Sequence, residues 1–468
     1  MRFIRLIQRV LNWRLARIAG PAPKLSFVGH IDGLDADGVA GWACGANNGA
    51  ATVEVLLNGI RVGTTPCDGI RPDVEAVGHR RQSGFHFDLS GVLDPSVTNR
   101  VYVRAVGSDD LLPGPAVIAK KNIRESMRQE GFDFSNSLFA ATAYTYEMNG
   151  SSAVVTGEVK SNGAAPTTIR AIDGGRLVSV EFQKFDSNSV LRAFGISTYS
   201  YSAVFELTDA PCLRFDFANP NQADLRPICA IPGLGGLTTF VPPDESRERV
   251  VGTMTSNNYI TLAYSSAALL WTFVEGEGNE GTWLDWGCGP GRTAIPLKRV
   301  FAKNWNIYGC DVDELNIKVL NRLDVNIPTK LIDLYPPLPY PDNMFDVVHG
   351  ISVLTHLTED TQKLWVNELA RVLKPGGLAL LTTHGELAIL MGGFVDEQAI
   401  YPAFIRRGIS DEIIDTALVT YIKDSAYYRA TFQTNANTRA LFGRHFDITR
   451  CIAGGHNNHQ DLWVLRRK

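Results

Sequence analysis

Long apolar runs are missing from this sequence of 468 residues. Nowhere do about 18 apolar residues follow one another, so no membrane-spanning helix is predicted. Cysteine is scarce, since only seven residues occur, far apart and without a C-x-x-C pair. An odd and scattered set favours free thiols in a reducing compartment over a disulfide framework. We therefore expect a cytoplasmic protein.

Charge of one sign is not in excess, because 45 Lys and Arg residues stand against 49 Asp and Glu residues, for a net charge of −4. Nucleic-acid-binding domains usually carry a basic excess, so we expect no nucleic-acid partner. The apolar content of 45% is that of an ordinary globular protein. The length predicts about two to four domains rather than a single core.

The first 18 residues are basic and amphipathic. Apolar side chains recur at helical spacing, arginines lie on the other side, and no acidic residue occurs among them. Such a helix can lie on an anionic membrane surface, but it can also cap a domain or pair with a partner helix. We predict a basic amphipathic helix at residues 1–22, with residues 1–18 as a candidate peripheral contact with the inner face of a membrane.

Two β-rich stretches follow. In residues 23–125 short strands alternate with turns, and Asn58-Gly59 is a strong hairpin signal. Elements such as G-H-I-D-G-L-D and L-L-N-G-I-R-V-G resemble a β-sandwich module that accompanies bacterial enzymes of surface-polysaccharide synthesis. Trp42 in this module is either a glycan or partner contact or a core aromatic residue. Residues 126–245 predict a second sandwich-like module and a linker, with an interaction or spacing role.

The stretch Thr282–Arg292, T-W-L-D-W-G-C-G-P-G-R, joins a short strand to a helical pattern through glycines at alternate positions. Glycine lets the backbone approach a ligand closely, and free N–H groups at a helix start favour an anionic group. A second strand ends about 20 residues later in Asp311, whose carboxylate would accept hydrogen bonds from a ribose. Strand, glycine loop, helix and acid together predict a nucleotide-type site.

The spacing of the glycines distinguishes between two possible cofactors. The nicotinamide fingerprint G-x-G-x-x-G requires a third glycine where Arg292 stands. The pattern D-x-G-x-G-x-G-R instead resembles motif I of class I S-adenosylmethionine-dependent methyltransferases. Segments 331–334, 341–348 and 368–377 resemble the third, fourth and fifth strand regions of that family, in the expected order. The resemblance covers Arg247–Lys468 and implies a Rossmann-like α/β domain with S-adenosyl-L-methionine as its cofactor.

The resemblance also implies a place for each part of the cofactor. The loop would hold the methionine part, Asp311 the ribose hydroxyls, and Val312 one face of the adenine. Asp333 would accept from the exocyclic amine of the adenine, although a helix-cap or turn role is the alternative. The expected cofactor residues are Asp285, Gly287, Cys288, Gly289, Gly291, Asp311, Val312, Asp333, Leu334 and Ile351.

A base is expected at the acceptor, because a hydroxyl group must lose its proton during methyl transfer. Histidine suits this task, and His356 and His384 follow the ends of adjacent predicted strands. Either is a candidate base, and the alternative for His356 is a packing or capping role. The stretches 350–357 and 380–385 resemble a bacterial methyltransferase subgroup tied to surface glycans, which implies a saccharide or glycan precursor as the acceptor.

The last part of the chain carries further candidates. Residues Tyr427, Tyr428 and Arg429 lie in an insertion that could form an acceptor lid or pack on the surface. The segment His456–Leu465 resembles the last strand of the family, antiparallel and beside the fifth. Its two histidines, His456 and His459, have no third ligand at a helpful spacing, so we expect no metal.

The sequence thus predicts two β-sandwich-like modules followed by an α/β methyltransferase domain at residues 246–468, with a helical lead-in at Thr255–Phe273. The predicted activity is methyl transfer from S-adenosyl-L-methionine to an oxygen of a saccharide. One alternative is a small-molecule or protein methyltransferase. The other is a non-catalytic scaffold or glycan-binding protein with an inactive transferase domain, against which the intact glycine loop and Asp311 argue.

Overall fold

The computed structural model describes most of the chain from Phe27 onward. The described residues are 27–34, 38–76, 78–89, 92–93, 99–108, 110–114, 117–118, 138–161, 165–185, 197–218, 228–236, 241–251, 256–391, 400, 403–404, 407–415 and 427–468. The helix predicted at residues 1–22, and with it the membrane contact of residues 1–18, lies outside them. Within these ranges, no helix has both the length and the apolar character needed to cross a membrane. The chain divides into two compact units, Met1–Ile123 and Arg124–Lys468.

The first unit is built of antiparallel strands in two sheets, with the orders β1-β2-β6-β5 and β4-β3-β7-β8. Its elements are β1 (Phe27–Leu34), β2 (Gly38–Gly45), β3 (Thr52–Leu57), β4 (Ile60–Pro66), β5 (Gly69–Ile70), α2 (Pro72–Glu75), β6 (Gln82–Asp88), β7 (Asn99–Ala105) and β8 (Val117–Ile118). One apolar cluster draws Val39 and Phe85 from the first sheet and Val53 and Val103 from the second. The predicted Asn58-Gly59 hairpin is confirmed, because both residues have positive φ and join β3 to β4.

The second unit begins with another β-rich region, whose sheets have the orders β12-β13-β10-β9 and β11-β14-β15. Its strands are β9 (Leu138–Asn149), β10 (Ser152–Ser161), β11 (Thr168–Asp173), β12 (Gly175–Phe185), β13 (Ser197–Leu207), β14 (Cys212–Ala218) and β15 (Ile228–Pro232). Aromatic side chains such as Phe205, Phe215 and Phe217 fill its core. The predicted β-rich character of both N-terminal regions is confirmed.

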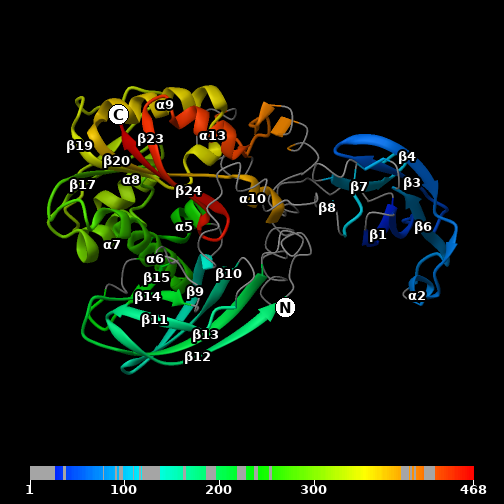
Figure 1. Ribbon diagram of the computed structural model, residues 1–468, viewed down its shortest axis with the longest axis horizontal. Helices are drawn as coiled ribbons and strands as arrows, with labels where there is room; N and C mark the ends of the chain where they lie inside the picture. Colours follow the sequence, from blue (N-terminus) through cyan, green and yellow to red (C-terminus); the bar gives the residue numbers. More distant parts are fainter. Residues whose placement is uncertain are drawn as a thin grey trace. The chain divides into compact units, whose positions relative to one another are not determined.

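A seven-stranded sheet of order β18-β17-β16-β19-β20-β24-β23 forms the centre of the C-terminal region (Figure 1). Its strands are β16 (Thr282–Trp286), β17 (Asn306–Asp311), β18 (Thr329–Leu331), β19 (Phe345–Gly350), β20 (Leu373–Thr383), β23 (Phe446–His456) and β24 (Gln460–Arg467). The first five are parallel, and β24 runs antiparallel beside β20. This confirms both the α/β domain and the antiparallel last strand beside the fifth.

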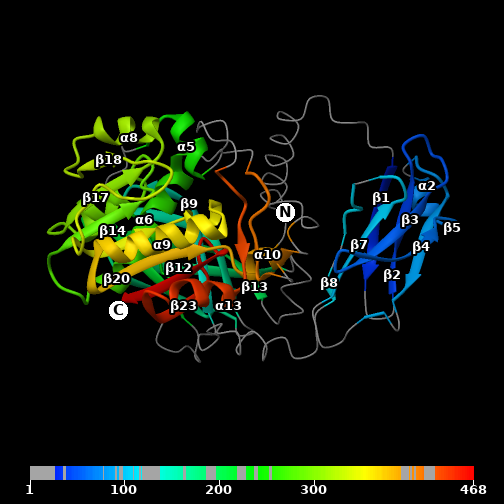
Figure 2. The ribbon, with the colours of Figure 1, turned by 90° about the horizontal axis from the view of Figure 1, so that it is seen from above.

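Helices and short elements connect these strands, and Figure 2 shows α9 running alongside β20. They are α5 (Asp244–Val251), α6 (Ser256–Val274), α7 (Ala294–Pro296), the π-helical turn η1 (Leu297–Phe301), α8 (Glu314–Asn321), the 3-10 turn η2 (Leu354–His356), α9 (Glu359–Val372), α10 (Glu386–Met391), β21 (Ile409–Ser410), β22 (Phe432–Gln433) and α13 (Asn435–Phe442). Helix α9 starts at Thr358, whose hydroxyl accepts a hydrogen bond from the Thr361 N–H, as an N-cap does.

Helix α6 joins the β-rich region to the parallel sheet, and it confirms the predicted helical lead-in. Tyr259, Tyr264 and Ala268 on this helix belong to the core of the β-rich region. Leu270 and Val274 belong to the core beneath the parallel sheet. One helix therefore contributes to two cores, and both regions lie within the same compact unit. The boundary proposed between residues 245 and 246 stays a prediction.

Candidate functional site

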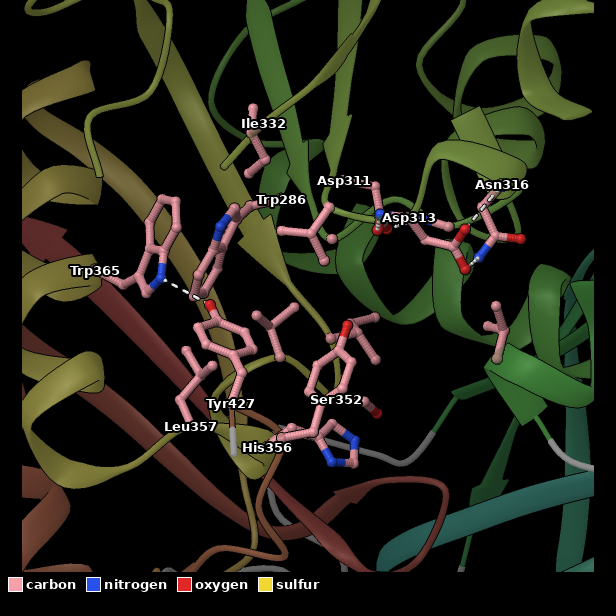
Figure 3. A pocket seen from close by; sticks show the side chains of 17 residues that line it. Trp286, Asp311, Asp313, Asn316, Ile332, Ser352, His356, Leu357, Trp365 and Tyr427 are labelled. Carbon is pink, nitrogen blue, oxygen red and sulfur yellow. Dashed lines mark hydrogen bonds between the residues drawn. The ribbon is translucent and has the colours of Figure 1, made fainter. Parts of the chain in front are cut away.

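A pocket opens at the carboxyl ends of the parallel strands β16, β17 and β19 (Figure 3). Parallel α/β sheets place ligands at this edge because the chain leaves neighbouring strands in opposite directions there. Half of the predicted cofactor residues line the pocket, namely Gly287, Gly289, Asp311, Val312 and Ile351. They come from three different strands that are far apart in the sequence.

The glycine loop after β16 has a backbone conformation that other residues rarely adopt. Gly287, Gly289 and Gly291 have φ values of +78°, +54° and +87°. A Cβ on Gly287 would lie 2.4 Å from Cγ2 of Val353, and one on Gly291 would lie 2.6 Å from Cδ1 of Leu320. Both distances are shorter than carbon atoms tolerate, so the loop requires glycine for packing as well as for conformation. Gly291 lies against Leu320 and does not line the pocket.

The loop is fastened to the end of the neighbouring strand β17. The N–H groups of Gly287 and Cys288 both donate to the carbonyl oxygen of Cys310, at 2.8 and 3.0 Å. The Cys288 thiol is buried behind the loop, and burial raises its pKa well above the usual value. Cys288 therefore supports the loop from the core side, and its side chain is not part of the pocket lining.

Asp311, the acid predicted to bind a ribose, is the last residue of β17. Its Oδ2 accepts from the Gly289 N–H at 2.7 Å, and its Oδ1 accepts from the Asp313 N–H at 2.8 Å. Burial raises the pKa of this carboxyl to about 6, against the opposing effect of the two amides. Each oxygen keeps a second lone pair, so the carboxylate can still accept from two hydroxyl groups.

Asp285 lies behind the pocket rather than in its wall. The Trp283 indole N–H donates to Nδ1 of His349 at 2.8 Å, so the proton of this imidazole is on Nε2. That Nε2 lies 3.0 Å from Oδ1 of Asp285. Both side chains are buried, with 1% and 4% exposure. Asp285 thus joins β16 to β19 behind the pocket.

Two further predicted residues, Asp333 and Leu334, are not brought to the pocket, because Ile332 lines it in this part of the chain. Asp333 is exposed. The Leu334 carbonyl accepts from the Trp365 indole N–H at 3.3 Å, so this residue supports the wall from outside. A shift of one position in a short loop decides which side chain faces inward, and sequence spacing does not resolve it.

Aromatic side chains form the end of the pocket opposite to Asp311 (Figure 3). The rings of Trp286 and Trp365 lie 5.2 Å apart, and the Trp365 indole N–H donates to the Tyr427 hydroxyl at 3.3 Å. Tyr428 completes this aromatic wall. For the two tyrosines the sequence left open an acceptor lid or surface packing, whereas it did not indicate the two tryptophans, because their patterns are those of core residues of a strand and a helix.

The two candidate bases occupy different environments. His356 lines the pocket, and its Nδ1 lies 3.3 Å from the carbonyl oxygen of Arg429 and 3.4 Å from Oδ2 of Asp415. His384 is stacked on Phe432 with ring centroids 4.9 Å apart and does not line the pocket. Burial lowers the pKa of His384 well below its usual value, so this imidazole is neutral. The structure therefore brings His356 to the site and leaves His384 behind it.

Comparison with known proteins identifies part of the chain. Residues 284–377 match the family of proteins described as "Methyltransferase domain". This stretch is a methyltransferase domain. Its cofactor is S-adenosyl-L-methionine, and the pocket fits that molecule on its own chemistry. The described lining includes Asp311 and Asp313 but no Lys or Arg, which suits a cationic sulfonium, and the glycine loop leaves room for the methionine part.

Several known methyltransferases are similar in sequence to the same part of the chain. The methyltransferase domain of this chain is similar to the tRNA N(3)-cytidine methyltransferase METTL2 of Bos taurus, with 29% identity over 133 residues, which are 27% of this chain and 35% of that protein. It is similar to the tRNA (carboxymethyluridine(34)-5-O)-methyltransferase of Arabidopsis thaliana, with 33% identity over 111 residues, 24% of this chain and 26% of that protein. The chain thus spans between about a quarter and about a third of the length of these relatives.

Solved structures resemble the same part. A S-adenosylmethionine-dependent methyltransferase from Methanosarcina mazei shares 18% identity, covers 42% of this chain and 96% of its own, and gives a TM-score of 0.33. A methyltransferase from Mesorhizobium loti shares 18% identity, with 43% and 99% coverage and a TM-score of 0.30.

The expected partners need correction. The relatives are named for tRNA, a nucleic acid, which contradicts both the saccharide acceptor and the absence of a nucleic-acid partner. The net charge misled because it is a sum over the whole chain and does not show where basic residues gather. The expected absence of a metal stays a prediction, as does the role of each cofactor residue.

Proposed function

We propose that this protein transfers a methyl group from S-adenosyl-L-methionine to a nucleoside of an RNA. The observation that carries the proposal is the likeness of the methyltransferase domain to enzymes named for tRNA nucleosides. The half-buried ring of Tyr428 in the pocket lining adds independent support, because flat heterocycles stack on such side chains. A pocket whose described lining lacks Lys and Arg suits the base of a nucleotide rather than its phosphate.

In this proposal the pocket has a cofactor end and an acceptor end. The Asp311 carboxylate would hold the ribose, the glycine loop the methionine part, and Val312 and Ile351 the apolar faces of the adenine. The bound cofactor supplies a methyl group on a positively charged sulfur. The protein brings the acceptor atom into line with that methyl group and excludes water, which accounts for much of the rate gain in such displacements.

His356 is the residue that we propose as the base. It lies between the aromatic wall and the end of β19, within reach of a molecule in the pocket (Figure 3). A base is needed only if the acceptor atom carries a proton, so this role applies to an O–H or N–H group of the nucleoside and not to a ring nitrogen without hydrogen, such as N3 of cytidine. His384 has no part in it, because this imidazole does not line the pocket.

The test is a methyl-transfer assay with the full-length protein. Total tRNA is incubated with deuterium-labelled S-adenosyl-L-methionine, digested to nucleosides and analysed by mass spectrometry. We expect a labelled nucleoside with the wild-type protein and much less of it with the variant Asp311→Asn at a cofactor concentration that does not saturate the variant. If the label appears in proteins or small molecules of a matched cell extract and not in RNA, the RNA acceptor is wrong. The protein is then a protein or small-molecule methyltransferase.

Calorimetry with the cofactor alone distinguishes an enzyme from a scaffold. We expect S-adenosyl-L-methionine to bind the wild-type protein and to bind Asp311→Asn more weakly. Absence of binding to the wild type would contradict the enzymatic proposal and leave the non-catalytic scaffold.

A further inference from the structure

The imidazole of His356 is held by two segments that follow β20 in the sequence. The Arg429 N–H donates to the carbonyl oxygen of His356 at 2.8 Å, which places the segment around Arg429 directly against the turn η2. The Asp415 N–H donates to the carbonyl oxygen of Tyr428 at 3.0 Å, which pairs the second segment with the first. The Tyr428 ring meets the His356 ring edge-on, with centroids 5.9 Å apart. These contacts fix the imidazole between backbone and ring.

The neighbours of Nδ1 decide which nitrogen of His356 carries the proton. Both atoms near Nδ1 are acceptors, namely Oδ2 of Asp415 at 3.4 Å and the carbonyl oxygen of Arg429 at 3.3 Å. A neutral imidazole therefore gains most when its proton is on Nδ1, which leaves a lone pair on Nε2. The side chains of His356 and Asp415 are each 23% exposed, so solvent screens their interaction only in part.

We propose that Asp415 is a positioning residue, which holds His356 with the proton on Nδ1 and so leaves Nε2 to take a proton from the methyl acceptor. This inference rests on the proposed function, in which His356 is the base. The proton leaves the O–H or N–H group of the acceptor and goes to Nε2. The imidazolium that forms carries a positive charge, and the Asp415 carboxylate offsets that charge.

Other ionisable groups lie near the same imidazole. The Tyr428 hydroxyl stays neutral, because burial raises the pKa of this residue far above its usual value. The Arg429 guanidinium donates to the carbonyl oxygen of Glu412 at 3.1 Å. His384 is neutral, because burial lowers its pKa well below the usual value. Asp311 and Asp313 line the same pocket, but of the described carboxylates it is Asp415 that lies within 4 Å of the imidazole, so Asp415 supplies the nearest negative charge.

The first experiment needs no acceptor. Diethylpyrocarbonate reacts with neutral imidazole, and peptide mass spectrometry follows the rate at His356 in the full-length protein as a function of pH. In Asp415→Asn no carboxylate offsets the charge of the imidazolium, so the acid limb of this rate should move to lower pH. The matched control is Glu412→Gln, an exposed neighbour paired with Arg407, which should leave the limb in place.

The second experiment measures methylation of the RNA. We expect Asp415→Asn to lower kcat by about 10- to 100-fold and to move the acid limb of kcat in the same direction, with KM and cofactor affinity within about twofold. Asp415→Glu should recover part of the rate. In a His356→Asn background the change Asp415→Asn should have no further effect on kcat, because Asp415 acts only through His356.

Each outcome decides the matter. An unmoved limb in the first experiment, or an equal loss from Asp415→Asn with and without His356, would show that Asp415 is merely structural and overturn the inference. A moved limb without any labelled RNA would support the Asp415 arrangement and contradict the RNA acceptor. Full activity of His356→Asn in labelling RNA would show that His356 is not the base and would contradict this role for Asp415. The RNA acceptor would still be supported.

Discussion

At the scale of single residues, the site depends on a few positions where no other side chain meets the physical demand. Gly287 combines positive φ with a Cβ direction that points into Val353. Asp311 combines burial with two backbone amides and free lone pairs that face the pocket. The sequence indicated both positions, because a strand followed by alternate glycines and a later acid is a pattern that depends on the local backbone.

The first prediction concerns Gly287. The substitution Gly287→Ala adds a clash with Val353 to the strain of a positive φ, and it should weaken S-adenosyl-L-methionine binding by at least about tenfold. Gly376→Ala is the matched control, because Gly376 has φ +74° but nothing within 4 Å of an added Cβ. We expect that variant to keep its cofactor affinity within about twofold. Calorimetry measures both, and equal losses would show that strain alone decides.

The second prediction concerns the pH dependence of cofactor binding. Ribose hydroxyl groups donate to the ionised carboxylate, so binding favours the form of Asp311 that predominates above its pKa of about 6. Cofactor affinity should therefore fall as the pH drops below about 6, by up to about tenfold per pH unit. In Asp311→Asn the affinity should be about 10- to 100-fold weaker and lose this dependence. A retained dependence would assign it to another group.

At the scale of elements, the β23–β24 hairpin carries a buried acid that the sequence did not single out. The Oδ1 atom of Asp461 accepts from the Gly454 N–H at 2.9 Å. Among the described residues its Oδ2 has no hydrogen-bond partner. Burial raises the pKa of this carboxyl to about 7. The antiparallel placement of β24 beside β20 was predictable from its pattern, whereas the burial of Asp461 depends on the neighbouring turns.

The third prediction follows from that burial. The folded state keeps Asp461 protonated up to a pH of about 7, while the unfolded chain ionises near its ordinary value, so this residue favours folding progressively more as the pH falls through that window. At about pH 8 the variant Asp461→Asn should raise the free energy of unfolding, on the order of 3 kcal/mol. The gain should shrink towards about pH 5. Thermal melts at both pH values measure it.

Asp346 gives the control of opposite sign. Lys374 and the Thr282 N–H hold the pKa of this carboxyl below its usual value despite some burial. The ionised form therefore stabilises the folded protein above the ordinary pKa, and Asp346→Asn should lower the melting temperature at neutral pH. A loss of stability in both variants at about pH 8 would contradict the assignment for Asp461.

At the scale of the whole molecule, helix α6 determines whether the methyltransferase domain can be separated from the β-rich region before it. Its side chains enter both the core of the β-rich region and the core beneath the parallel sheet. The β-rich region therefore covers an apolar helix face of the methyltransferase domain. Composition and strand patterns predicted both regions, but they did not show that one helix would belong to both.

The fourth prediction compares two truncations. A protein of residues 124–468 keeps the second compact unit intact, so it should fold and bind S-adenosyl-L-methionine with an affinity within about threefold of the full chain. A protein of residues 246–468 exposes Tyr259, Tyr264 and Ala268, and it should aggregate or melt at a clearly lower temperature. Size-exclusion chromatography and thermal melts measure this. Equal behaviour of the two would show that the β-rich region gives the domain no stability.

The resemblance to class I methyltransferases implied the cofactor, and the sequence by itself determined the glycine loop, the acid at the end of β17 and the alternation of strands and helices. These features follow from backbone conformation and hydrophobic period, which are local properties of the chain. Only the tertiary structure decided that Asp285 lies behind the pocket against His349, that two core-like tryptophans line the pocket, and that His356 rather than His384 faces it. Those facts depend on contacts between segments up to a hundred residues apart, such as His356 and Arg429, and no local pattern records them.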